Sequence, residues 1–165
     1  ILARICSRLK QHDRAVAEAE LAIGLNPSSA NSYLVLGICL MARGLLGEAL
    51  PQIETAIRLV PSGSYHKVKL QAKGFGLYLM GDFDNAEACM RSALQGPSIG
   101  PFGWLNLAAV MVRQGRPEEA RDAVQKALDI RPGMTLATYR QVFEGFTDDH
   151  VDRAAADVKA AGLPV

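Results

Sequence analysis

Apolar residues recur along the chain at steps of three and four residues, with polar and charged positions between them. Leu34, Ile38 and Met41 show these steps, inside a stretch that is apolar throughout. This spacing places apolar side chains on one face of a helix and therefore favours helices over strands. The pattern predicts five first helices, near residues 1–11, 30–43, 66–80, 101–114 and 135–146. It predicts five second helices, near residues 13–25, 47–59, 83–95, 117–130 and 149–161.

Small residues repeat at a fixed interval across these helices. One series, at intervals of 34, 37, 34 and 34 residues, comprises Ala15, Ala49, Ala86, Ala120 and Ala154. A second series lies seven residues later and comprises Ala22, Ala56, Ala93, Ala127 and Ala161. Gly44, Gly81 and Gly115 keep the same interval, and each follows an apolar-periodic stretch, where a left-handed helix cap is favoured. The chain is therefore predicted to be a series of antiparallel helix pairs.

Stacking of these pairs must supply most of the stability, because one pair alone cannot bury its apolar faces. Where two helices cross, a Gly or Ala lets the backbones approach closely. We therefore expect Ala120 to lie buried at a crossing. Pro61 and Pro132 separate repeats, because proline cannot continue a preceding helix.

The order of these residues resembles the tetratricopeptide repeat family. The family pattern has an aromatic residue, then Leu with a small residue, a helix-ending Gly, two spaced alanines and a closing Pro. One repeat matches it through Trp104, Leu107, Ala108, Gly115, Ala120, Ala127 and Pro132. Another matches through Tyr33, Leu36, Gly37, Gly44, Ala49, Ala56 and Pro61. The resemblance implies an all-α fold, a right-handed superhelical solenoid of antiparallel helix pairs that forms a single domain over residues 1–165.

The resemblance also divides the chain into repeats. These are a partial repeat at about 1–29, three repeats at 30–63, 67–100 and 101–134, and a degenerate capping repeat at 135–165. The repeat at 67–100, the third in the chain, departs from the pattern, with Leu70 in the aromatic position and Lys73 in the Leu position. The fifth has Val142 where a small residue is usual, which is why it is predicted to be a cap.

The resemblance further implies that the first helices line a concave groove that binds a peptide or helix of a partner protein. The pattern places an apolar set there: Leu34, Ile38, Met41, Phe75, Tyr78, Phe102, Leu105, Ala109, Val112 and Tyr139. The polar residues near positions that could grip a terminal carboxylate are Asn31, Asn106, Arg113 and Arg140. An amphipathic helix or extended apolar segment therefore fits this groove better than a terminal carboxylate does. An apolar stripe at helical spacing is also what a buried core requires, and both alternatives stay open.

Composition excludes several other classes. The chain has 165 residues, 49% of them hydrophobic, and 18 Lys and Arg against 17 Asp and Glu, which argues against disorder. A nucleic-acid binder would carry a basic excess, which is absent. The longest apolar stretch has ten residues, against the roughly 20 that span a bilayer. Cys6, Cys39 and Cys89 lie in apolar runs, so we expect reduced thiols in a cytoplasmic protein.

No catalytic residue, cofactor or metal site is predicted, and we expect the chain not to be an enzyme. The three histidines fall in different repeats and are predicted to be solvated surface residues: His12, His66 and His150. Three acids follow Gly81, where carboxylates cap helix amides and offset the helix dipole: Asp82, Asp84 and Glu87.

Residues 147–165 resemble the C-terminal ends of bacterial proteins in which tetratricopeptide repeats follow a class III nucleotide cyclase domain or a winged-helix regulator domain. The chain also begins inside a helical pattern at Ile1, so we expect it to be part of a longer protein. The first functional hypothesis is an interaction scaffold that recruits a separate protein. The alternative is a C-terminal regulatory or dimerisation region of a bacterial signalling protein. In that alternative the partner can be a second copy of the chain, in a homodimer.

Overall fold

The computed structural model describes residues 12–63, 65–96 and 100–165. Within these ranges the helices are α2 (His12–Leu25), α3 (Ala30–Ala42), α4 (Leu46–Leu59), α5 (His66–Met80), α6 (Phe83–Ala93), α7 (Pro101–Arg113), α8 (Pro117–Ile130), α9 (Leu136–Val142) and α10 (Asp148–Ala160). The all-α prediction is confirmed. The predicted helix near residues 1–11, with Cys6, lies outside the described residues.

The turns within the helix pairs form where glycines were predicted to end the first helices. Gly44, Gly81 and Gly115 have φ values of 79°, 88° and 70°, in the left-handed region that residues with a Cβ rarely adopt. After the third of these turns, Pro117 occupies the first turn of α8, where its missing amide hydrogen leaves no bond unmade. Glu118 and Glu119 follow in the same turn and complement the helix dipole.

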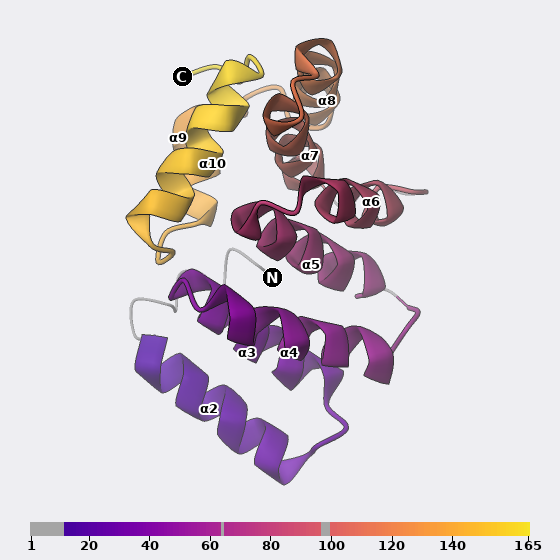
Figure 1. Ribbon diagram of the computed structural model, residues 1–165, viewed down its shortest axis with the longest axis vertical. Helices are drawn as coiled ribbons and strands as arrows, with labels where there is room; N and C mark the ends of the chain where they lie inside the picture. The colour runs from indigo at the N-terminus through magenta and orange to yellow at the C-terminus, as the bar shows by residue number, and fades with distance from the viewer. Residues whose placement is uncertain (1–11, 64, 97–99) are drawn as a thin grey trace.

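Helices α2 to α8 form a stack of pairs (Figure 1). The members of each pair pack on each other in α3–α4, α5–α6 and α7–α8, and α2, α4 and α6 each pack on the helix that follows. Alanines fill the crossings, with exposed fractions of at most 2% at Ala49, Ala56, Ala86, Ala93, Ala120, Ala127, Ala154 and Ala161. The buried crossing predicted for Ala120 is therefore confirmed.

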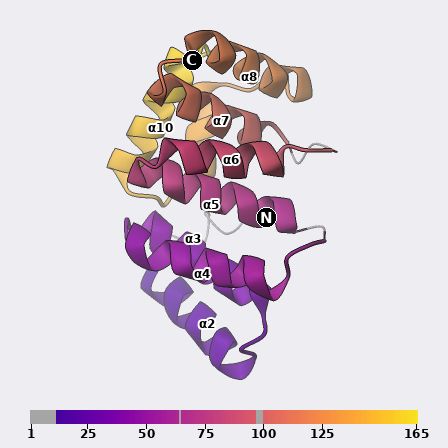
Figure 2. The same cartoon turned by 45° about the vertical axis from the view of Figure 1, so that its right-hand side comes forward.

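The last pair, α9 and α10, does not extend this stack. Its main contact with the preceding pair is made by α10 against α7, and α10 lies across the stack instead of on top of α8 (Figure 2). Helix α9 is also shorter than the helix predicted over 135–146, because it ends at Val142 and residues 143–147 form the turn into α10. The pair therefore covers the side of the stack formed by α3, α5 and α7.

Candidate functional site

The residues predicted to line the groove lie on α3, α5, α7 and α9. Eight of them are buried: Leu34, Ile38, Met41, Phe75, Tyr78, Leu105, Ala109 and Tyr139. Phe102 and Val112 are half-buried. Most of this apolar set belongs to the core, and the helix pair α9–α10 packs against it. We call the side of the stack formed by α3, α5 and α7 the inner face, and the α9–α10 pair with its turn the C-terminal hairpin.

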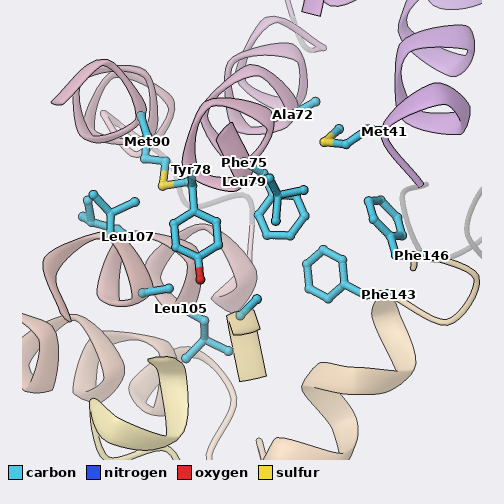
Figure 3. Close-up of a cluster of buried hydrophobic side chains, with 14 of the residues drawn as sticks. Met41, Ala72, Phe75, Tyr78, Leu79, Met90, Leu105, Leu107, Phe143 and Phe146 are labelled. Carbon is cyan, nitrogen blue, oxygen red and sulfur yellow. The ribbon is translucent and has the colours of Figure 1, made fainter. Parts of the chain in front are cut away.

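The first half of the C-terminal hairpin contributes aromatic side chains to the inner face. Phe143 stacks on Phe75 of α5, with ring centroids 4.7 Å apart, and the Phe146 ring lies 6.0 Å from Phe75 (Figure 3). The buried Tyr139 hydroxyl donates a hydrogen bond to Asn106 Oδ1 of α7, at 2.9 Å. The first half of the hairpin therefore runs from α7 towards α3, and its aromatic side chains occupy the apolar space between the inner helices.

The second half of the hairpin runs back along the C-terminal ends of the inner helices. The Thr147 amide, just before α10, donates to the Ala42 carbonyl at the end of α3 (3.0 Å). Six residues later, the Arg153 guanidinium donates to the Leu79 carbonyl of α5 (2.6 Å). Asp157 then reaches α7. Helix α10 thus contacts three successive repeats in order.

Asp157 forms the polar centre of this contact. Its Oδ2 atom accepts a hydrogen bond from the Tyr78 hydroxyl at 2.5 Å and another from Arg113 Nε at 2.6 Å. Asp157 is 6% exposed and Tyr78 is 1% exposed. A carboxylate withdrawn from water in this way is stable only when donors satisfy it, and these two side chains supply them.

The surroundings keep both donors protonated. Burial raises the pKa of Tyr78 well above its ordinary value, and the hydrogen bond to Asp157 raises it further. The hydrogen bond to Asp157 also raises the pKa of Arg113. Arg153 adds a second cation, 5.8 Å from the centre of the Tyr78 ring. The site therefore presents a hydroxyl donor and positive charge to one carboxylate.

Sequence reasoning placed Tyr78 and Arg113 near the groove but missed Asp157. A signal was present. Asp157 lies among Ala154, Val158 and Ala161, all of which are buried, so the apolar face of α10 carries one acid. A single charged residue on a buried face requires a partner of opposite charge, and the pattern alone does not say which of the chain's basic residues supplies it.

The prediction that the histidines are solvated is wrong for two of them; the His12 side chain lies outside the described part of the structure. His66 and His150 are half-buried, and the Nδ1 atom of each is buried without a hydrogen-bond partner. The reason at His150 is the hairpin, which brings its ring beside Gly44 at the end of the second repeat's first helix. Burial there lowers the pKa of His150, and the Arg153 charge lowers it further.

The acids after Gly81 have structural roles. Asp82 caps α6 by accepting from the Asn85 amide, which confirms the predicted capping. Glu87 instead pairs with Arg91 (2.7 Å) and Arg116 (2.8 Å). Burial alone would raise the pKa of Glu87, but the hydrogen bonds from these two arginines lower it overall.

Other reactive groups in the described residues show no built site. No group of three or more His, Cys, Asp or Glu side chains there is arranged to hold a metal ion. Burial raises the pKa of the Cys39 thiol to about 11, so this thiol stays protonated and inert at neutral pH. The inner face with its hairpin is therefore the candidate site.

The geometry defines the class as an α-helical repeat protein whose stacked pairs present one long apolar face. Two sequence profiles of the tetratricopeptide repeat family match the chain, at residues 2–64 and 101–134. The chain belongs to the tetratricopeptide repeat family. No curated protein matches the sequence significantly.

Several solved structures share the fold. A thermophilic tetratricopeptide repeat protein of Thermus thermophilus, TTC0263, has a TM-score of 0.69 at 23% identity, over 95% of this chain and 78% of the other. MamA of Desulfovibrio magneticus has a TM-score of 0.68 at 17% identity, over 96% and 88%. YrrB, described as a tetratricopeptide repeat protein with an unusual peptide-binding site, has a TM-score of 0.63 at 16% identity, over 95% and 82%. The all-α solenoid prediction is confirmed.

None of the helices in the described ranges has the length and apolar character that crossing a membrane requires.

Proposed function

We propose that the chain is a non-enzymatic scaffold for protein–protein interaction, and that the inner face of α3, α5 and α7 binds a helix or peptide of a partner protein. The observation that carries this proposal is the occupation of that face by a helix pair. A surface that buries Phe143 and Phe146 of its own hairpin has the shape and apolar character to hold a helix. The shared fold of YrrB, which has a peptide-binding site, supports this assignment by analogy.

Family membership supports the scaffold class, and the residues support the choice of surface. Phe102 and Val112 are the two predicted groove residues that the hairpin leaves half-buried. They mark the part of the inner face that a partner reaches first. The reduced thiols expected from the sequence, among them the inert Cys39, favour a cytoplasmic partner.

A photo-crosslinking experiment tests the proposal. A photoreactive phenylalanine analogue replaces Val112 on the inner face or Gln125, an exposed residue of α8, as the matched control. In cells, we expect Val112 to give a discrete crosslinked protein and Gln125 to give none. The purified partner should then bind the unmodified chain, and Val112→Glu should weaken that binding while Gln125→Glu leaves it unchanged. Equal crosslinking at both positions would contradict the inner face as the binding surface.

A second candidate function is favoured by the same hairpin. A chain that covers its own inner face suits a regulatory or dimerisation region whose surfaces serve the protein that contains it. Analytical ultracentrifugation at micromolar concentration separates the two candidates in part, because a stable dimer favours the second and a monomer favours recruitment of a separate protein.

A further inference from the structure

We propose that Tyr78 and Arg113 form a recognition site for an acidic side chain on an amphipathic partner helix, and that Asp157 of α10 occupies this site until the partner replaces it. This inference rests on the proposed function and names the partner's chemistry. The partner is a helix that carries one Asp or Glu within a stripe of small apolar residues, as α10 does.

The first step in the argument is that the site fits a carboxylate. Tyr78 is buried and supplies a hydroxyl hydrogen, while Arg113 supplies Nε, and both meet at one oxygen of Asp157. Arg113 belongs to α7 and Tyr78 to α5, so both donors are part of the stack and not of the hairpin. A charge-assisted pair in a largely desolvated site discriminates strongly between a carboxylate and a neutral group.

The second step is that the helix around the acid must be narrow. Ala154 and Ala161, on either side of Asp157, are at most 2% exposed, and Val158 is fully buried. Small side chains let α10 approach the ends of α5 and α7 closely enough for the short Asp157 side chain to reach both donors. A partner helix with Leu or Phe at those two alanine positions would be held too far away, so the same surface also rejects bulkier helices.

The third step is that, once α10 has left, the site favours another helix that carries a carboxylate. If the hairpin leaves, Tyr78 and Arg113 lose their acceptor, and an apolar helix would bury both without one. Leaving a buried donor unpaired is unfavourable, so the vacated site prefers a helix with a carboxylate at the corresponding position. The Arg113 side chain is 39% exposed, so the polar end of the site can be reached from solvent.

The test uses the full chain and a fluorescein-labelled synthetic peptide with the sequence of residues 147–165. Fluorescence anisotropy measures peptide binding to the wild-type chain and to Asp157→Asn. The substitution weakens the occupant and leaves both donors in place. We therefore expect the peptide to bind the variant at least about tenfold more tightly than the wild type, because the substitution removes the charge from the acceptor of both hydrogen bonds. Equal affinity for the two chains would overturn the proposal.

A matched peptide and a matched chain separate charge recognition from unspecific apolar binding. A peptide with Asn at the position of Asp157 should bind the Asp157→Asn chain about tenfold more weakly than the acidic peptide. Adding Arg113→Met should abolish this difference, whereas adding Arg121→Met, which removes an exposed ion pair on α8, should preserve it. If Arg121→Met also abolished the difference between the two peptides, the assignment of Arg113 would be overturned.

Hydrogen exchange on the wild-type chain keeps the proposal falsifiable if Asp157→Asn does not fold, which circular dichroism would reveal. Saturating acidic peptide should speed exchange of the chain's own α10 amides by displacing that helix, and the Asn peptide should not. No change in the hydrogen exchange of the α10 amides would overturn the proposal.

Dimerisation of Asp157→Asn by swapping of α10 between two copies would also overturn the proposal, because the occupant would then be a second copy of the chain. If a partner crosslinks to the inner face but the acidic peptide does not displace α10, the proposed function stands. Only the recognition of an acidic side chain by Tyr78 and Arg113 is then overturned.

Discussion

At the scale of single residues, the space beside each small side chain decides its role. Gly37 and Gly47 are both helical glycines of the second repeat. A Cβ on Gly37 would lie 2.5 Å from Ile53 Cγ1 and 3.0 Å from the Ala49 carbonyl, while a Cβ on Gly47 would meet nothing within 4 Å. Gly37 therefore sets how closely α3 and α4 approach, and Gly47 does not.

This contrast gives the first prediction. Gly37→Ala should lower the free energy of unfolding by about 1–3 kcal/mol, because the added methyl group overfills the crossing. Gly47→Ala should leave it unchanged or raise it by up to about 1 kcal/mol, because alanine restricts the unfolded chain. Urea denaturation followed by circular dichroism measures both, and equal effects of the two substitutions would contradict the close approach at Gly37.

His150 gives a prediction about pH. Its pKa is lowered in the folded chain by burial and by Arg153, while the Asp149 charge partly offsets this. The unfolded chain therefore binds a proton at higher pH than the folded chain, so stability is full above the unfolded pKa of about 6.5 and falls as the pH drops below it. Between pH 7.5 and pH 5.5, the melting temperature of the His150→Gln chain should fall by less than that of the wild-type chain. An equal fall in both chains would show that His150 contributes nothing to the pH dependence of stability.

At the scale of elements, the second helices of the pairs depend on alanine where they cross the first. Ala120 of α8 is fully buried, and Ala88 of α6 is exposed. Ala120→Leu should destabilise the chain by about 1–3 kcal/mol through overpacking, and Ala88→Leu should change stability by less than about 0.5 kcal/mol. Thermal melts compare the two, and an unchanged melt for Ala120→Leu would contradict the crossing.

The hairpin depends instead on large side chains. Phe143 is buried between Phe75 and Tyr139, with ring centroids 4.7 Å and 5.0 Å away. Phe143→Ala should lower the free energy of unfolding by about 3–5 kcal/mol, as for other buried phenylalanines. Tyr65→Ala, at a 51% exposed aromatic residue, is the control and should cost less than about 0.5 kcal/mol. Urea denaturation measures both, and a small effect of Phe143→Ala would indicate that the hairpin binds the inner face only weakly.

Across the whole molecule, the stack could be predicted from the sequence and the position of its last pair could not. The intervals between alanines and between glycines set the number and order of helix pairs, because each pair packs mainly on its neighbours. Ala154 in α10 and Ala161 at its C-terminal cap keep that interval, so the local pattern predicted another repeat at the end. Contacts between residues distant in the sequence hold the hairpin against the inner face, such as Asp157 with Tyr78 and Phe143 with Phe75. Such contacts leave no periodic pattern in the local sequence.

These distant contacts predict cooperative unfolding. In a simple stack each repeat contacts only its neighbours and the ends can unfold separately. Here the hairpin joins α3, α5 and α7. We therefore expect fluorescence of Trp104, on α7, and circular dichroism of the whole chain to show the same urea midpoint. Separate midpoints would indicate that the pairs unfold independently of the hairpin.

The two ends of the hairpin are also tied to each other. The Leu136 amide at the start of α9 donates to the Pro164 carbonyl beyond α10, at 2.7 Å. Only residues 131–135 connect this closed unit to α8. Arg131, Pro132 and Gly133 among them are exposed, but Met134 is 1% exposed and belongs to the buried core. The connection is therefore itself anchored, and the hairpin is held to the stack at its first residues as well as through its contacts with the inner helices.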